Sequence, residues 1–278
     1  MNMRKKLILI FSALILICAA AIVIPGWHRN TSSIQCDAPT ITRIRQSGVL
    51  LVGTTGDYRP LTFLEPDGSY TGFGIELAEA IAEELGVDVR FVPTSWPTLT
   101  SDVMDDPQKF DLAIGGITIT EKRLETMLMS DGYLANGKTI LCRSADAGRF
   151  SSLEDIDKPE VRVMVNPGGT NEQLAREKLT HATIIVHESN LEIPHLIAEA
   201  VADVMITEVT EAPYYTATDD RLAAPLIDNP FTRSFIGVLM RMGQDDLMEA
   251  VNSLIRRMKA DGSLRELHEK YGLVYNVE

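Results

Sequence analysis

Cysteine and histidine are scarce in this sequence of 278 residues, which contains three cysteines and five histidines. His181 and His187 lie on or beside one predicted strand, too far apart to share a metal ion, and the other histidines are isolated. Neither Cys36 nor Cys142 has a neighbouring histidine or a CxxC spacing. These patterns argue against a metal centre and against a nucleophilic thiol, and we expect neither.

Two common enzyme motifs and an excess of positive charge are also missing. The sequence contains no GxSxG elbow and no dinucleotide fingerprint. With 26 basic and 39 acidic residues its formal net charge is −13. A chain this acidic is not expected to bind nucleic acid, although a local positive site can still bind a small anion. We therefore expect a small-molecule ligand and no cofactor.

The long hydrophobic run of the sequence lies at its N-terminus. Three basic residues, Arg4, Lys5 and Lys6, precede a mostly apolar run at 7–24 that includes small residues at 19–21. Residues 1–24 are therefore predicted to be a cleaved export signal, with an uncleaved signal anchor as the alternative because the run is nearly long enough to span a bilayer. Either way the folded part is expected in the periplasm, and an anchor would tether it to the membrane.

The N-terminal segment also affects the charge and the cysteines. Removal of residues 1–21 takes three basic residues and no acidic one, so the net charge would move from −13 to −16. An oxidising compartment permits a disulfide between Cys36 and Cys142, but their sequence separation says nothing about geometry, and the pairing stays open.

Beyond a polar tether at 25–40, strand and helix patterns alternate, which predicts an α/β protein. The first series has predicted strands at 49–55, 87–92 and 110–116 and a helix at 75–85. The second has predicted strands at 161–165, 183–187 and 204–207 and helices at 173–179 and 193–201. A strand at 235–240 and helices from Asp245 and at 263–270 follow. Two such units predict two lobes, with a ligand cleft between them near the carboxyl ends of the strands.

A candidate anion site lies at 163–172, where a short apolar strand runs into two glycines and a helix. Thr170 or Asn171 can cap this helix, so that free N–H groups and the positive end of the helix dipole face one spot. The alternative is an ordinary strand-to-helix turn.

Polar and aromatic side chains follow the predicted strands of the first unit. Asp57 and Tyr58 come after one strand, and Trp96 lies between two prolines after another, where it suits an apolar cleft wall. Thr118 and Arg123 follow a third strand and could converge on a carboxylate. The alternatives are that the rings serve lobe packing and that Arg123 forms a surface ion pair with Glu121 or Glu125.

An acidic pair, Glu208 and Glu211, follows a predicted strand of the second unit. One helical turn would place both on one face, where two carboxylates can have their pKa values driven apart and one can stay protonated as a general acid. The alternative is that both merely complement a helix dipole.

Together these stretches resemble the periplasmic solute-binding proteins of the polar amino acid type, from about residue 41 to 273. The resemblance rests on residues 57–60, 68–78, 116–120 with Arg123, and 261–264. Residues 54–58, 93–97, 137–139, 166–172 and 207–212 are similar to a catalytic branch of that family, the cyclohexadienyl dehydratases. The resemblance implies a two-lobed periplasmic-binding-protein fold of type II, with lobe 1 at 41–140 plus 233–278, lobe 2 at 141–232 and the ligand cleft between them.

This resemblance implies a carbon–oxygen lyase that converts prephenate to phenylpyruvate, or arogenate to phenylalanine, with loss of carbon dioxide and water. A general acid that protonates the leaving hydroxyl contributes about 100- to 10,000-fold to such a reaction. Glu211 matches the acid proposed in the family, and Asn166 and Asn171 match the other polar groups of the catalytic set. The substrate-binding residues carried over are Arg123, Thr118, Thr170, Tyr58, Trp96, Glu208, Asp57 and Lys138.

A binding protein that delivers an amino acid or organic anion to the permease of an ABC importer fits the same fold. Glu211 with Asn166 and Asn171 favours the enzyme, because these polar groups have little purpose in a plain amino acid receptor. Amino-acid-binding relatives usually carry Asp where this chain has Glu208, so the choice between prephenate and arogenate stays open.

Overall fold

The computed structural model describes residues 39–105 and 107–277 of the chain. The expected signal segment at 1–24, the tether up to residue 38 and Cys36 lie outside these residues. Within the described ranges, no helix combines the length and the apolar character needed to cross a membrane.

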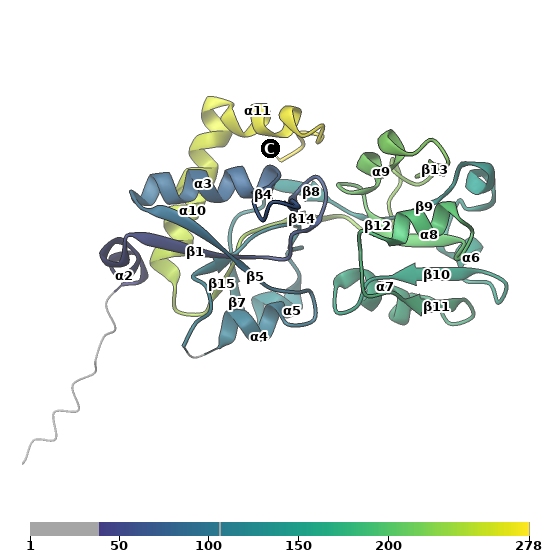
Figure 1. Cartoon of the computed structure of the whole chain (residues 1–278), viewed down its shortest axis with the longest axis horizontal. Coiled ribbons are helices and arrows are strands. Elements are labelled where there is room, and N and C mark those ends of the chain that lie inside the picture. Colours follow the sequence, from purple (N-terminus) through teal and green to yellow (C-terminus); the bar gives the residue numbers. More distant parts are fainter. Residues whose placement is uncertain (1–38, 106, 278) are drawn as a thin grey trace, which may run out of the picture. The chain divides into compact units, whose positions relative to one another are not determined.

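One five-stranded sheet is formed by segments from both ends of the described chain (Figure 1). Its strands are, in spatial order, β5 (Asp88–Pro93), β1 (Val49–Thr54), β6 (Leu112–Ala113), β15 (Leu239–Arg241) and β7 (Met127–Met129). β1 runs parallel to β5 and β6, whereas β15 runs antiparallel to β6 and β7. We call the part of the chain built on this sheet lobe 1.

Alternating side chains of β1 enter two different apolar clusters, which cover the two faces of the sheet. Leu50 and Val52 pack in the cluster that contains the helices α2 (Thr40–Ser47), α3 (Phe73–Leu85), α10 (Asp245–Asp261) and α11 (Ser263–Lys270). Leu51 packs in the other cluster, with α4 (Leu99–Met104). α3 and α10 end at Gly86 and Gly262, whose φ angles of 72° and 87° lie in the left-handed region that glycine tolerates.

A second five-stranded sheet is formed by the middle of the chain, and we call the part built on it lobe 2. Its strands are, in spatial order, β11 (Thr183–Val186), β10 (Arg162–Val165), β12 (Val204–Glu208), β9 (Lys138–Arg143) and β13 (Leu222–Ala223). β11, β10 and β12 are parallel, and β9 is antiparallel to β12 and β13. Because the three parallel strands end at one edge, the residues that follow them gather there.

The faces of the second sheet again carry separate clusters. Val163 and Val165 pack with α6 (Leu153–Ile156) and α7 (Thr170–Lys178), whereas Met164 packs with α8 (Ile193–Ala198) and α9 (Ala212–Thr218). A 3-10 helix, η1 (Ser144–Arg149), follows β9.

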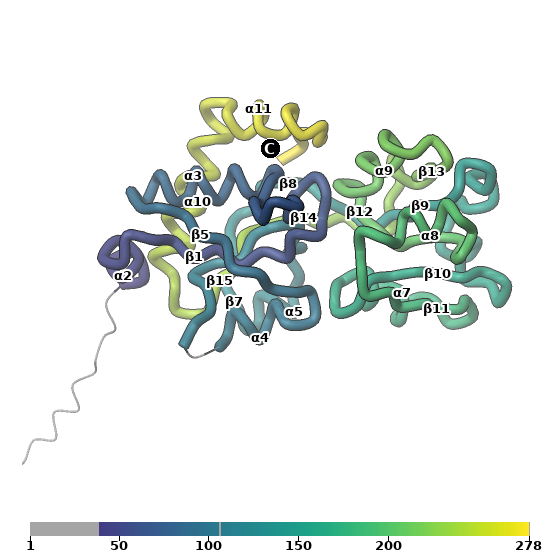
Figure 2. The backbone as a smooth tube through the Cα atoms, viewed as in Figure 1, coloured from purple at the N-terminus to yellow at the C-terminus, as the bar shows by residue number. Residues whose placement is uncertain are grey.

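The chain passes between the two sheets twice, and the connections lie side by side (Figure 2). On the way out β8 (Leu134–Asn136) leads into β9, and on the way back the chain enters β14 (Ser234–Ile236), which pairs with β8. A Cβ at Gly137 would lie 2.3 Å from the carbonyl oxygen of Thr232, so only glycine permits this approach. Paired connections of this kind form a hinge about which two lobes can rotate.

Most of the predicted helices and strands are present, but two predicted strands are wrong in extent. The strand expected at 110–116 shrinks to β6, because Gly115 and Gly116 turn the backbone with φ angles of 121° and 73°. The strand expected at 235–240 is two strands, β14 and β15, because Gly237 bonds the carbonyl of Ile117 between them. β9 pairs in the second sheet from Lys138 onward, three residues before the expected start of lobe 2.

Candidate functional site

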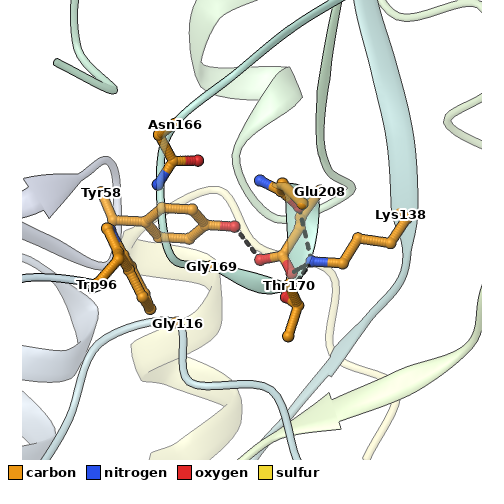
Figure 3. A pocket seen from close by; sticks show the side chains of 9 residues that line it. Tyr58, Trp96, Gly116, Lys138, Asn166, Gly169, Thr170 and Glu208 are labelled. Carbon is orange, nitrogen blue, oxygen red and sulfur yellow. Dashed lines mark hydrogen bonds and ion pairs between the residues drawn. The ribbon is translucent and has the colours of Figure 1, made fainter. Parts of the chain in front are cut away.

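A small cavity lies where side chains of the two lobes meet, and its free volume of about 20 Å³ is the size of one water molecule (Figure 3). Tyr58 belongs to the small sheet of β2 (Asp57–Tyr58), β3 (Thr62–Leu64) and β4 (Tyr70–Thr71) of lobe 1. The lining residues are Tyr58, Trp96 and Gly116 of lobe 1 and Lys138, Asn166, Gly169, Thr170, Asn171 and Glu208 of lobe 2. Six of the residues predicted for the site are thus brought together with Glu208.

An ion pair between Lys138 and Glu208 occupies the centre of this site. The side chains are only 6% and 3% exposed, so the pair is shielded from water. The ammonium of Lys138 also donates to Thr170 Oγ1 at 2.5 Å and to Asn171 Oδ1 at 2.7 Å. All three donor hydrogens of the lysine are therefore used, and its position is fixed.

Lobe 1 donates to the same carboxylate. The hydroxyl of Tyr58 points at Glu208 Oε2 and donates to it, as Figure 3 shows, and Thr118 Oγ1 donates to Oε1 at 3.2 Å. Burial raises the pKa of Glu208, but the charge and hydrogen bonds of Lys138 and the hydroxyl of Tyr58 outweigh it and hold that pKa below its usual value. Glu208 is thus a carboxylate shared by both lobes.

The predicted anion site at the start of α7 has a different cap from the one expected. The N-cap is Gly169, and neither Thr170 nor Asn171 caps the helix through its side chain. Both are the first residues of the helix, and their side chains accept from Lys138 instead. The ammonium of Lys138 therefore lies beside the helix N-terminus, with its charge balanced by Glu208 in this conformation.

Arg123 lies near the site but does not line the cavity. The hydroxyl of Thr120 caps α5 (Glu121–Leu124) by accepting from the backbone N–H of Arg123. The Arg123 guanidinium donates to the carbonyl oxygen of Thr118 at 2.6 Å. Burial lowers the pKa of Arg123 while the charge of Glu208 opposes this, so the two charges lie within electrostatic reach.

Glu211 is fully buried and does not line the cavity either. Its carboxyl accepts from Thr207 Oγ1 and from Asn190 Nδ2, the latter at 2.8 Å, and Tyr215 Oη lies 3.5 Å away. Burial is the main cause that raises the pKa of Glu211 to about 8, and the charges of Glu208 and Asp57 add to it. The group is therefore protonated at neutral pH.

The expected helical face shared by Glu208 and Glu211 is not formed. Glu208 ends β12, and Glu211 is the N-cap of α9, with its N–H bonded to the carbonyl of Glu208 at 3.0 Å. The two carboxyl groups consequently enter separate hydrogen-bond networks. Their pKa values are nevertheless driven in opposite directions, as predicted for the pair.

Asn190 is a buried residue of this region that sequence reasoning missed. It is 2% exposed, and besides Glu211 its amide donates to the backbone oxygen of Asp57 in lobe 1, at 3.1 Å. The carboxylate of Asp57 in turn accepts from Trp96 Nε1 at 3.0 Å, and burial raises the pKa of Asp57. Asn190 comes shortly after β11, at the edge where Asn166 follows β10 and Glu208 ends β12. This position is the signal that could have identified it.

Two other patterns of the sequence do not form sites. Residues 132–139 match the spelling GxxxxGK[ST] of a phosphate-binding loop, but they form β8 and β9, and no helix follows the lysine. Cys142 is buried in lobe 2, and this burial is the main cause that raises its pKa to about 11. Its thiol is therefore a poor nucleophile. Across residues 39–105 and 107–277, no three His, Cys, Asp or Glu side chains gather into a set that could bind a metal ion.

Comparison with known proteins identifies relatives of this arrangement. Residues 50–274 match the family described as bacterial extracellular solute-binding proteins, family 3. The chain is similar to cyclohexadienyl dehydratase of Pseudomonas aeruginosa, with 41% identity over 201 residues, 72% of this chain and 74% of that protein.

Two solved structures are also similar. One is the ancestral amino acid-binding protein AncCDT-1, a precursor of cyclohexadienyl dehydratase, with 38% identity, a TM-score of 0.77 and coverage of 84% of this chain and 99% of the other. The second is an ancestral cyclohexadienyl dehydratase, a variant of AncCDT-3, with 49% identity, a TM-score of 0.52 and coverage of 84% and 97%. The expected α/β class and two-lobed periplasmic-binding-protein fold of type II are thereby confirmed.

Proposed function

Because the chain belongs to the bacterial extracellular solute-binding proteins, family 3, we propose that its cleft binds a small organic acid and converts it as a decarboxylating dehydratase. The proposed reactions are prephenate to phenylpyruvate and arogenate to phenylalanine, in the periplasm and without a cofactor. The likeness to cyclohexadienyl dehydratase supports this proposal, since it extends over 72% of the chain.

The proposed reaction makes two demands on the protein. The ring carboxylate leaves as carbon dioxide, its bonding electrons enter the ring, and the ring hydroxyl leaves as water after it takes one proton. The site must therefore bind a dianion and deliver that proton. A general acid that delivers the proton accelerates such a reaction by about 100- to 10,000-fold. We assign delivery of the proton to Glu211. Binding of the dianion is assigned to Lys138, Arg123, Thr118 and the N-terminus of α7.

The buried carboxyl of Glu211 is the observation that carries this proposal. A carboxyl whose pKa is raised to about 8 holds a proton at neutral pH yet can release it, as a general acid must. The hydroxyl of Tyr58 lies within electrostatic reach of Glu211, because its pKa is raised first by burial and then by the charges of Glu208 and Glu211. A substrate that displaces this hydroxyl would lie between Lys138 and Glu211.

Binding requires the cleft to open, because pockets for ligands of this kind hold about 300 Å³ or more and the cavity holds about 20 Å³. Rotation about the paired connections through Gly137 would separate Tyr58 from Glu208 and admit the substrate. The lobes would then close on it. The proposed moving bodies are lobe 1 at 41–140 plus 233–278 and lobe 2 at 141–232, except that residues 138–140 move with lobe 2 because β9 pairs in its sheet.

Gly168 is predicted to control this closure. Its φ is 78°, and a Cβ there would lie 2.5 Å from the Cα of Pro97 in the other lobe. We expect Gly168→Ala to weaken the binding of phenylpyruvate about tenfold or more, or about 1.4 kcal/mol, measured by titration calorimetry. Gly86→Ala is the matched control, because Gly86 has a φ of 72° and open space around it. Both variants should lose similar stability through backbone strain, and equal affinities in the two would contradict a role of Gly168 in closure.

Glu208 bears on the choice of substrate. An amino acid needs a carboxylate for its ammonium group, but Glu208 is already paired with Lys138. We therefore expect prephenate, which has a keto group in place of the ammonium, to be converted at least about tenfold more efficiently than arogenate, a difference of about 1.4 kcal/mol. Comparison of kcat/KM for the two substrates tests this, and a preference for arogenate would mean that Lys138 releases Glu208 in the complex.

A receptor that binds without converting its ligand is the second candidate. The observation that favours it is that neither Arg123 nor Glu211 lines the cavity in the described conformation. The deciding experiment incubates the purified exported protein with prephenate, without added metal, and follows phenylpyruvate formation. Turnover supports the dehydratase, whereas tight binding with prephenate unchanged over hours supports the receptor.

A further inference from the structure

Asn190 connects the candidate acid to the opposite lobe through a single amide nitrogen. Nδ2 donates to the backbone oxygen of Asp57 at 3.1 Å and to Glu211 Oε1 at 2.8 Å. Asp57 lies on β2 of lobe 1, whereas Asn190 and Glu211 belong to lobe 2. The contact with Asp57 therefore exists only while the lobes are together.

The orientation of this amide follows from its partners. A backbone carbonyl oxygen can only accept a hydrogen bond, so the NH2 group of Asn190 must face Asp57, and its second hydrogen then points at Glu211. The amide oxygen, Oδ1, is buried and has no hydrogen-bond partner among the described residues. An unpartnered buried oxygen is costly, and rotation of the amide would let Oδ1 accept a hydrogen bond from the protonated carboxyl of Glu211.

We propose that Asn190 is a positioning residue that couples closure of the cleft to the release of the proton from Glu211. With the lobes apart, nothing on Asp57 fixes the amide, and Oδ1 accepts the carboxyl hydrogen and so favours the protonated form. On closure Asp57 turns the NH2 group toward Glu211, and an N–H donor favours the carboxylate. The proton passes to the leaving hydroxyl of the substrate, and solvent restores it after reopening. This inference rests on the proposed dehydratase function.

Other charged and titratable groups also act on Glu211, but none of them replaces the hydrogen bond from Asn190. Asp57 and Glu208 raise its pKa by their charge, the hydroxyl of Tyr215 lies 3.5 Å from Oε1, and Tyr58 and Lys138 lie within electrostatic reach. Of these groups, Asp57 and Tyr58 belong to lobe 1. Asn190 is distinct because its bond to Glu211 changes from accepting to donating as the lobes meet.

The test measures the proton on Glu211 directly. In protein labelled with 13C at the glutamate carboxyl carbons, the Glu211 signal is the one that Glu211→Gln removes, and its titration gives the pKa with phenylpyruvate bound. We expect Asn190→Ser and Asn190→Leu to raise that pKa by about one pH unit or more, or about 1.4 kcal/mol, since both variants lose the hydrogen bond that favours the carboxylate. We also expect kcat to fall about tenfold or more and the alkaline limb of its pH profile to move up equally.

Asn252→Ser is the matched control. Asn252 is a buried asparagine of α10 in lobe 1, 7% exposed, whose Oδ1 accepts from the backbone N–H of Asp131 at 2.7 Å. This variant should lose stability but keep the pKa of Glu211 and kcat. An unchanged Glu211 titration in both Asn190 variants would overturn the coupling. If the titration moves while wild-type protein leaves prephenate unconverted, the coupling stands and the dehydratase function fails.

Discussion

Glu211→Gln is expected to lower kcat for prephenate by about 100- to 10,000-fold, the usual contribution of a general acid. The amide keeps the shape of the carboxyl and can keep both partners, because the hydroxyl of Thr207 can accept as well as donate. It cannot release a proton to the substrate. Affinity for phenylpyruvate should therefore stay near the wild-type value while turnover is lost, as measured by steady-state kinetics and calorimetry.

The pH profile provides the internal check on this variant. Because the acid must carry its proton, wild-type kcat should fall about tenfold per pH unit above the pKa of about 8. Glu154→Gln, at an exposed position of α6, is the matched control and should leave the profile unchanged. Residual turnover above about a tenth of wild type in Glu211→Gln would assign the proton transfer to another group.

The same raised pKa changes stability in a way that needs no substrate. Between the ordinary glutamate pKa of 4.5 and about 8, the folded protein holds a proton that the unfolded chain has released. The contribution of Glu211 to the free energy of unfolding should then fall with rising pH by about 1.4 kcal/mol per unit in this window, and it is complete below pH 4.5 and lost above about 8. Buried His268, whose pKa is lowered, contributes the opposite slope equally in the wild type and in Glu211→Gln. Glu211→Gln should lack the falling slope, as measured by urea unfolding across the window.

The fold was largely predictable because apolar spacing and turn residues mark most of its helices and strands. The apolar spacing of α3 and α10 and the glycines that end them specify those helices before any tertiary contact is known. The strands at 110–116 and 235–240 were not predictable, because their extent depends on glycines at 115, 116 and 237 whose backbone conformation is set by the neighbouring lobe segments.

The location of the site was predictable for a different reason. Parallel strands end at a common edge, so residues at the carboxyl ends of β10 and β12, such as Asn166 and Glu208, must lie together. The pairing of Lys138 with Glu208 was not predictable from the sequence. It joins β9 to β12 by an antiparallel register that only the folded sheet defines. The same holds for Asn190, whose partner in lobe 1 is 133 residues away.

Lys138→Met is expected to have the largest effect on stability, a loss of about 3–5 kcal/mol in the free energy of unfolding at neutral pH. The substitution removes the ammonium and leaves the carboxylate of Glu208 buried with only the neutral donors Tyr58 and Thr118. Such a carboxylate should take up a proton more readily, so the loss should shrink as the pH falls. Urea unfolding at several pH values measures both effects.

Two further variants separate this effect from the simple loss of a charge. Lys270→Met breaks the ion pair with Glu76 at 2.7 Å, in which the side chains are 61% and 31% exposed, and should cost only about 0–1 kcal/mol. The double variant Lys138→Met with Glu208→Gln should regain much of the lost stability, because no unpaired charge is then left in the interior. Lys138→Met could instead lower the free energy of unfolding no more than Lys270→Met does. The Lys138–Glu208 pair would then not be held in the dry environment that its burial implies, and the site would lack the fixed positive charge on which anion binding depends.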